Sequence, residues 1–157
     1  MHARVDYKTQ AAGVYKAMGG LEHYLHTCGL EERLIHLIKL RASQLNGCAY
    51  CIDMHWKDLR AIGENEQRLY GLDAWRESPY YTDRERAALT WTEAVTLITD
   101  GHVPDEDYEA VRPHFDGKEL ADLMFAIATI NAWNRLAIAL RVEPGTYQPR
   151  VSSGTSA

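Results

Sequence analysis

The chain of 157 residues has few of the features that place a protein in a membrane or outside the cell. Its three cysteines are a sparse and odd set, which excludes the disulfide framework of a small secreted protein. No apolar run predicts a transmembrane span, and the first residues, MHARVDYKTQ, lack the apolar stretch of a secretory signal. We therefore expect a cytoplasmic protein with no membrane partner.

Basic charge is also scarce. Lysine and arginine together number 17 against 22 aspartates and glutamates, which gives a formal net charge of −5 at pH 7. Proteins that bind nucleic acids draw much of their affinity from clustered lysine and arginine. This charge balance therefore predicts that nucleic acid is not a partner.

The chain does contain enough apolar residues to build one core. Hydrophobic residues make up 46% of the sequence and charged residues 25%, and a chain of this size buries a core without disulfides. We expect a single domain at residues 1–145. The chain after Pro144 is rich in serine, glycine, threonine and proline, and residues 146–157 are expected to form a disordered tail.

Apolar residues recur at spacings of three and four along most of the chain, which is the pattern of amphipathic helices. Thr82 and Glu85 form a capping-box pattern at the start of one of them. The expected helices are 7–27, 31–45, 51–62, 64–72, 82–99, 104–114 and a long last helix that begins after Asp116. No strand pattern is present, so the predicted fold class is all-α.

The stretch SQLNGCAYCIDMH contains a C-x-x-C pair followed by a histidine. Asn46 and Gly47 predict the end of one helix, so Cys48 and Cys51 are expected in the first turn of the next. Unpaired amide groups and the helix dipole favour a thiolate there. Cys48, Cys51 and His55 then fall within an arc of roughly 60° on that helix. This arrangement suits two-electron thiol oxidation and disulfide exchange.

A zinc site is the main alternative for this motif. Cys48, Cys51 and His55 offer three ligands, with Cys28 or water in the fourth position. No second C-x-x-C or H-x-x-x-H completes a structural site, so we predict no metal and no cofactor, and expect Cys28 to be a packing residue. The histidines that lie in no motif are expected at the surface: His2, His23, His26, His102 and His114.

The stretch 37–56, with Arg41, the run SQLNGC, Tyr50 and His55, resembles the core of the AhpD-like alkylhydroperoxidases in the carboxymuconolactone decarboxylase family. The run EQRLYGLDAWRESPYYTDRERAALTWTEAVTLI is similar to the peroxidase-related branch of that family. The resemblance implies an AhpD-like helical bundle, with the C-x-x-C pair at the start of a helix, that assembles into trimers or hexamers.

The resemblance also implies an activity, the thiol-dependent reduction of hydroperoxides in antioxidant defence. In this family Cys51 would attack the peroxide, Cys48 would resolve the product as a disulfide, and His55 would belong to a proton relay. The implied partners are a hydroperoxide substrate, a thiol or disulfide reductant, and further copies of the chain.

One position departs from the family pattern. The relay usually starts from a glutamate twelve residues before the first cysteine, and here that position is His36. A histidine accepts a proton near neutral pH, but it lacks the fixed negative charge that raises the basicity of His55. We include His36 among the predicted catalytic residues, and consider Glu93, on an otherwise apolar helix, as a substitute carboxylate.

Two other functions compete with peroxide reduction. The family name suggests decarboxylation of a muconolactone, but members with that activity typically lack the cysteine pair, so its presence favours redox chemistry. The other alternative is a non-catalytic sensor whose disulfide only records oxidation. Alkylation of both cysteines separates the three functions, because only the peroxidase needs free thiols for turnover.

The last predicted helix also bears on assembly. Residues 120–140 are apolar almost all round the helix, which is too apolar for a helix exposed on a monomer of this size. We therefore expect a homo-oligomer, and light scattering at micromolar concentration measures its mass. A mass near 17.8 kDa, that of one chain, would contradict this prediction.

Overall fold

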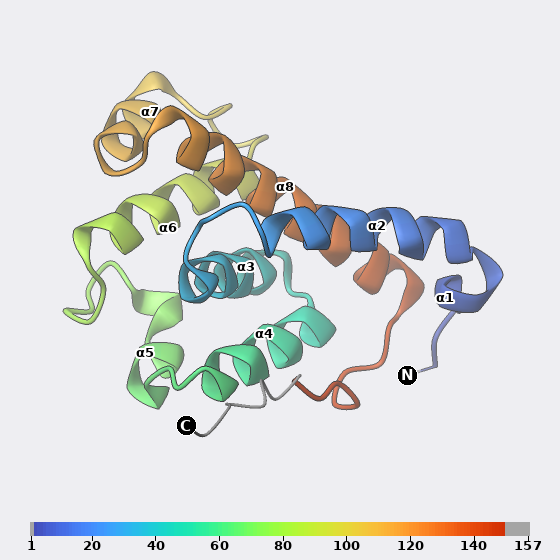
Figure 1. Ribbon diagram of the computed structural model, residues 1–157. Helices are drawn as coiled ribbons and strands as arrows, with labels where there is room; N and C mark the ends of the chain where they lie inside the picture. The colour runs from blue at the N-terminus through green and yellow to red at the C-terminus, as the bar shows by residue number, and fades with distance from the viewer. Residues whose placement is uncertain (1, 150–157) are drawn as a thin grey trace, which may run out of the picture.

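The computed structural model describes residues 2–149, which form α-helices and 3-10 turns without a strand (Figure 1). The predicted all-α fold class is confirmed. The helices are α1 (Tyr7–Gln10), α2 (Ala12–Leu25), α3 (Glu32–Asn46), α4 (Ala49–Ala61), α5 (Glu66–Tyr70), α6 (Asp83–Thr96), α7 (Asp105–Val111) and α8 (Gly117–Leu140).

Helix α3 is the centre of the bundle and contacts α4, α6 and α8. Its apolar residues point to more than one side, because successive positions on a helix are about 100° apart. Leu37 and Leu40 pack in one cluster with Leu59 of α4. Ile38 packs in another cluster with Leu123 of α8. Burial on several sides fixes α3 and makes it the support for the helices around it.

The turn after α3 sets the position of the cysteine pair. Gly47 ends the helix in the left-handed conformation, with φ 68° and ψ 33°, as the Asn-Gly pair predicts. The N–H of Gly47 donates to the carbonyl of Gln44 (3.1 Å), and the N–H of Cys48 to that of Ser43 (2.9 Å). The chain then reverses, and α4 runs back along α3 (Figure 1).

Capping boxes start two helices of the bundle. At α6 the Thr82 hydroxyl accepts from the N–H of Glu85, and the Glu85 carboxylate accepts from the N–H of Thr82. Asp116 and Glu119 make the same reciprocal pair at α8. Each box satisfies two amide groups that have no partner inside the helix. The capping box predicted at Thr82 is confirmed.

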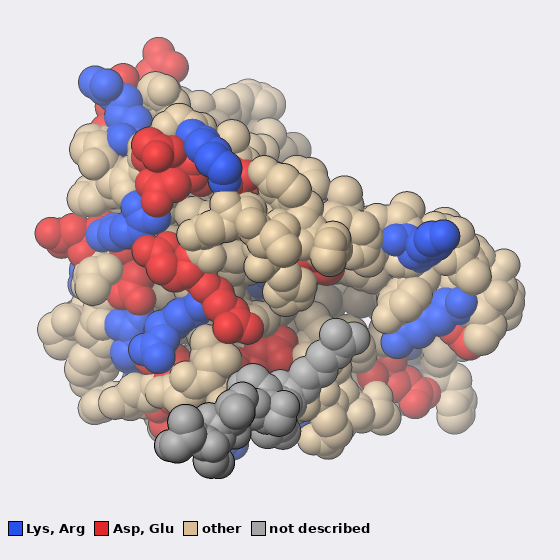
Figure 2. Space-filling model, in the orientation of Figure 1, with Lys and Arg blue, Asp and Glu red and all other residues tan. Residues whose placement is uncertain are grey.

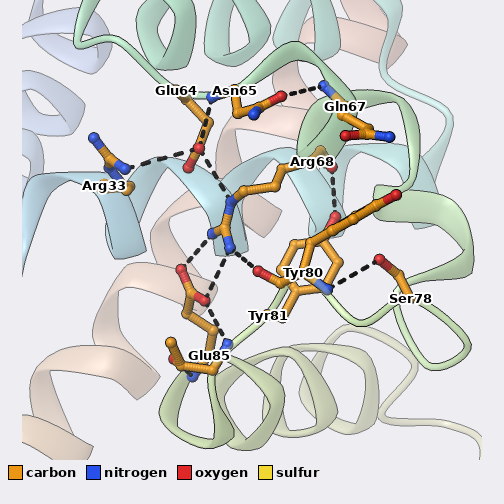
Figure 3. A network of polar contacts seen from close by, with 10 residues as sticks. Arg33, Glu64, Asn65, Gln67, Arg68, Ser78, Tyr80, Tyr81 and Glu85 are labelled. Atoms are coloured by element: carbon orange, nitrogen blue, oxygen red, sulfur yellow. Dashed lines mark hydrogen bonds and ion pairs between the residues drawn. The ribbon is translucent and has the colours of Figure 1, made fainter.

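A network of charged and polar groups joins the α4–α5 loop to the start of α6 (Figure 3). At its centre, the Arg68 guanidinium lies 3.0 Å from the buried carboxylate of Glu64 and 2.5 Å from that of Glu85. Arg33 of α3 approaches Glu64 at 3.8 Å, and the Tyr81 hydroxyl donates to the carbonyl of Arg68. These contacts hold α5 and the capped start of α6 against α3.

Two predicted segments differ from the structure at the start and the end of the chain. The helix expected at 7–27 is two helices, because Ala11 leaves the helical region at φ −137° and ψ 56°. At the other end, the first residues of the expected disordered tail lie on α4. Lys57 donates to the carbonyl of Tyr147 (3.1 Å), whose hydroxyl donates to Asp58 (2.7 Å). Residues 150–157 lie outside the described residues.

Helix α8 corrects the expectation that no segment is apolar and long enough to span a membrane. By length and composition it is, with a mean hydropathy of 1.4. It nevertheless packs against α2, α3, α4 and α6 as the core helix of the bundle. Met124 and Ile138 are large apolar side chains on its exposed face, and the surface where α2 crosses α8 is largely uncharged in Figure 2.

Substitution of Gly47 tests the turn. We expect Gly47→Ala to lower the free energy of unfolding by about 1 kcal/mol, because a side chain disfavours the left-handed conformation. No atom lies within 4 Å of the added Cβ, so the loss reports backbone strain alone. Denaturant unfolding measures it. Gly19→Ala, in open space inside α2, is the matched control and is expected to raise the free energy of unfolding. Equal changes in both variants would contradict the attribution of the loss at Gly47 to backbone strain.

Candidate active site

The cysteine pair lies at the start of α4, as predicted. Cys48 is the N-cap residue, and Cys51 follows in the first turn. Both side chains are buried, at 1% and 2% exposure, in a cluster with Ala42 of α3 and with Ile130 and Ala137 of α8. The two sulfur atoms are 2.7 Å apart, against about 2.05 Å in a disulfide. A small movement therefore suffices to join them.

The two thiols have unequal affinities for a proton. The hydrogen bond with the Cys51 thiol lowers the pKa of Cys48 to about 7, and the backbone N–H groups of Cys51 and Tyr50 add to this effect. The same hydrogen bond and burial raise the pKa of Cys51. The pair therefore holds one proton near neutral pH, with the charge on Cys48, where the first turn of the helix stabilises an anion.

Asn134 of α8 is the polar side chain beside this pair. It is fully buried, accepts a hydrogen bond from Asn46 (2.8 Å) and donates one to the Ser43 hydroxyl (3.1 Å). Its amide also lowers the pKa of both Cys48 and Cys51, since a hydrogen-bond donor favours the charged form of a thiol. α8 thus contributes directly to the stability of the thiolate.

A second polar cluster lies further along the α3–α4 hairpin. Nδ1 of His36 on α3 is 3.2 Å from Nδ1 of His55 on α4. The Oδ2 atom of Asp58, one turn after His55, is 3.7 Å from each of these two nitrogen atoms. The structure therefore brings the two predicted histidines together, as the antiparallel packing of α3 and α4 requires.

Burial keeps both imidazoles neutral. Together with the charge of Lys39, it lowers the pKa of His36 to about 4 and that of His55 well below its usual value. This corrects the expectation that His36 accepts a proton near neutral pH. Burial also raises the pKa of the Asp58 carboxyl. His55 Nε2 is buried and has no hydrogen-bond partner among residues 2–149.

Two residues considered as site members lie elsewhere. Glu93 accepts hydrogen bonds from Arg41 (2.8 Å), Trp75 (2.7 Å) and Arg76 (2.7 Å). Burial alone would raise the pKa of Glu93, but these donors outweigh it and lower the pKa. Asp58, and not Glu93, is the carboxylate beside the histidines. Cys28 lies in a different cluster from the C-x-x-C pair, and its thiol donates to a carbonyl in α2, which removes it as a zinc ligand for the pair.

Sequence reasoning missed three residues of the two clusters. Asp58 carries a local signal, since a carboxylate three residues after His55 lies on the same side of a helix. Asn134 carries a weaker one, a polar residue inside the apolar run of α8. Tyr147, whose hydroxyl donates to Asp58, has no sequence signal, because only the folded chain brings it to α4.

The motif-free histidines are exposed as predicted, except that His114 is partly buried.

Comparison with known proteins agrees with this fold and motif. A model of the carboxymuconolactone decarboxylase family matches residues 12–94, more than half of the chain, and this span contains both cysteines and both histidines of the site. The chain belongs to this family as an AhpD-like member.

Individual relatives cover nearly the whole chain. The uncharacterized protein YdfG of Bacillus subtilis is 46% identical over 140 residues, which are 89% of this chain and 95% of that protein. The crystal structure of ATU0492 from Agrobacterium tumefaciens, described as a proposed antioxidant defence protein AhpD, is 44% identical. It has a TM-score of 0.90 and covers 93% of this chain and 100% of its own.

A more distant structure shows that the fold also serves other chemistry. The debrominase Bmp8 has a TM-score of 0.73 at 20% identity, and the match covers 87% of this chain and 74% of that one. At this identity the similarity is one of fold alone. The function must therefore be argued from the residues of the site.

The role of Asn134 is testable through the thiolate. We expect Asn134→Ala to raise the pKa of Cys48 by about one unit, because a hydrogen bond to a charged group contributes about 1.5–3 kcal/mol. The ultraviolet absorbance of the thiolate, followed against pH, measures the midpoint, and circular dichroism checks the fold. Asn131→Ala is the control, since Asn131 also accepts from Asn46. The same midpoint in both variants would rule out a specific role for Asn134.

Proposed function

We propose that this protein reduces hydroperoxides through a dithiol–disulfide cycle of Cys48 and Cys51, as an antioxidant enzyme. The observation that carries the proposal is the pair itself, two sulfur atoms 2.7 Å apart at the first turn of α4. One of them is stabilised as a thiolate near neutral pH. The similar protein ATU0492, described as a proposed antioxidant defence protein, supports the same function.

The cycle balances with two electrons. The thiolate attacks the terminal oxygen of the hydroperoxide, an S–O bond forms, the O–O bond breaks, and the alkoxide takes a proton and leaves as an alcohol. The second thiol then attacks the sulfenic sulfur. A disulfide forms, and the hydroxide leaves as water with the proton of that thiol. A dithiol reductant from outside the chain returns two electrons and two protons.

We assign the attack to Cys48 and the resolving step to Cys51. The family resemblance implies the opposite order, but the backbone N–H groups of Tyr50 and Cys51, in the first turn of α4, stabilise the charge on Cys48 and not on Cys51. Because the thiolate is the nucleophile, the sulfur that holds the resting charge is the one that attacks. The two assignments place the sulfenic acid on different residues.

His55 and His36 are assigned to the proton relay. His55 lies one turn after Cys51 on the same helix, and its Nδ1 contacts His36. A neutral imidazole passes a proton by accepting it at one ring nitrogen and releasing it from the other. His55 Nε2 is buried without a partner among the described residues, and we assign proton exchange with the cysteines to this ring nitrogen.

The surroundings of the Cys48–Cys51 pair bear on which substrate, reductant and further copies of the chain we propose as partners. Tyr50 packs against the cluster that contains both cysteines, which places a phenol beside the pair. With both sulfur atoms buried in a single chain, a small hydroperoxide fits the site better than a large one. A homo-oligomer covers the exposed apolar face of α8, and a cytoplasmic location supplies the thiol or disulfide reductant.

Serine variants of the two cysteines test the function and the order of attack. Cys51→Ser is expected to lose turnover but to consume about one equivalent of tert-butyl hydroperoxide, a small substrate, leaving a sulfenic acid on Cys48. Cys48→Ser is expected to consume none. Mass spectrometry after trapping with a sulfenic-acid reagent locates the oxidised residue, and the oxidised wild type should show an intramolecular disulfide at the mass of one chain.

A reversed order of attack and a failure of the proposed function give different results. A sulfenic acid on Cys51 in the Cys48→Ser variant would restore the order implied by the family and leave the function standing. Turnover in both variants would exclude the cycle of Cys48 and Cys51. A wild type that forms a disulfide but never consumes more than one equivalent of peroxide would exclude the peroxidase. The last result would identify a sensor. Cys28→Ser is the control, because its thiol lies in a separate cluster, and it should retain turnover.

A further inference from the structure

Three potential ligand atoms converge between α3 and α4. Nδ1 of His36 and Nδ1 of His55 are 3.2 Å apart, and each lies 3.7 Å from Oδ2 of Asp58. Three atoms at these separations surround a point that is roughly 2 Å from all of them, which is the bond length of zinc to imidazole nitrogen and carboxylate oxygen. The spacing therefore matches a coordination site as well as a hydrogen-bonded cluster.

We propose that His36, His55 and Asp58 bind a divalent transition-metal ion, with Zn²⁺ as the best match. Two imidazoles and one carboxylate are a ligand set that such ions accept, with a fourth position left to a solvent molecule. The site shares His36 and His55 with the proposed proton relay but contains neither cysteine. An ion bound at the two Nδ1 atoms would therefore stop proton transfer between them.

Two of the three ligands, Asp58 and His36, have outer contacts typical of a metal site. The Tyr147 hydroxyl donates to Oδ1 of Asp58 at 2.7 Å, which orients Oδ2 toward the two histidines. Glu32 lies 3.8 Å from Nε2 of His36, on the side opposite the proposed ion. Outer contacts of this kind, a carboxylate behind a histidine and a hydrogen bond to a ligating carboxylate, orient ligands and strengthen metal binding.

Charge and access both bear on an ion at this site. Lys39 lies close enough to lower the pKa values of both histidines, but its ammonium group is paired with Glu22 at 2.5 Å, which offsets part of its repulsion of a cation. Among the described residues, Asp58 and Glu32 are the carboxylates within 4 Å of the histidines. The side chains of His36 and Asp58 are 13% and 12% exposed. Solvent therefore reaches the cluster, and an ion can enter without unfolding the hairpin.

Metal titration of the full chain tests the proposal. We expect isothermal calorimetry to show one Zn²⁺ per chain, both in the wild type and in a Cys48→Ser/Cys51→Ser variant. The ligand-field spectrum of bound Co²⁺ is expected to lack sulfur charge-transfer bands. Because the double variant has no peroxidase chemistry, this result is independent of the proposed function. No stoichiometric binding in the micromolar range would overturn the proposal.

Single substitutions locate the ion. His36→Ala and Asp58→Asn are each expected to weaken Zn²⁺ binding by about 100-fold or more, and Tyr147→Phe by about 10-fold. Asp53→Asn is the matched control, since Asp53 lies on the same helix and accepts a hydrogen bond from the N–H of Gly145. This variant should bind Zn²⁺ as the wild type does. Wild-type affinity in Asp58→Asn and His36→Ala would place the ion elsewhere and overturn the site.

Discussion

The antiparallel packing of α4 on α3 is the constraint on which both polar clusters depend. Gly47 reverses the chain in a turn that glycine adopts without strain. This reversal places His36 opposite His55 and leaves the start of α4 against α8, where Asn134 meets the two cysteines. A longer or looser turn would separate the facing residues, and each cluster needs its atoms within a few ångströms of one another.

Burial has opposite effects on the two clusters. In the low dielectric of the interior, an isolated charge is costly unless hydrogen bonds satisfy it. Backbone N–H groups and the Asn134 amide supply such bonds to Cys48, so the thiol loses its proton readily. Among residues 2–149, the carboxylates nearest the imidazoles of His36 and His55 are those of Asp58 and Glu32, at 3.7 Å or more, so burial keeps the imidazoles neutral. The same interior thus holds one stable anion and two uncharged bases within a single helical hairpin.

Local features were predictable from the sequence, and contacts between distant segments were not. The capping box at Thr82 and the placement of Cys48 and Cys51 follow from interactions within a few residues. Glu93 was misassigned because its partners come from two segments distant in sequence, Arg41 on α3 and the adjacent Trp75 and Arg76, and their hydrogen bonds hold it away from the histidines. Asn134 is more than 80 residues from its partners Ser43 and Asn46, a distance over which sequence patterns give no register.

The hydrogen bond between Tyr147 and Asp58 links the end of the described chain to the interior of the hairpin. Lys57 holds the same segment through the carbonyl groups of Gly145 and Tyr147. Release of this segment therefore exposes backbone that a protease can cut, and frees a carboxylate in the same event. The rate of proteolysis near the carboxyl end becomes a reporter of the conformation of Asp58, readable on a gel without any label in the site.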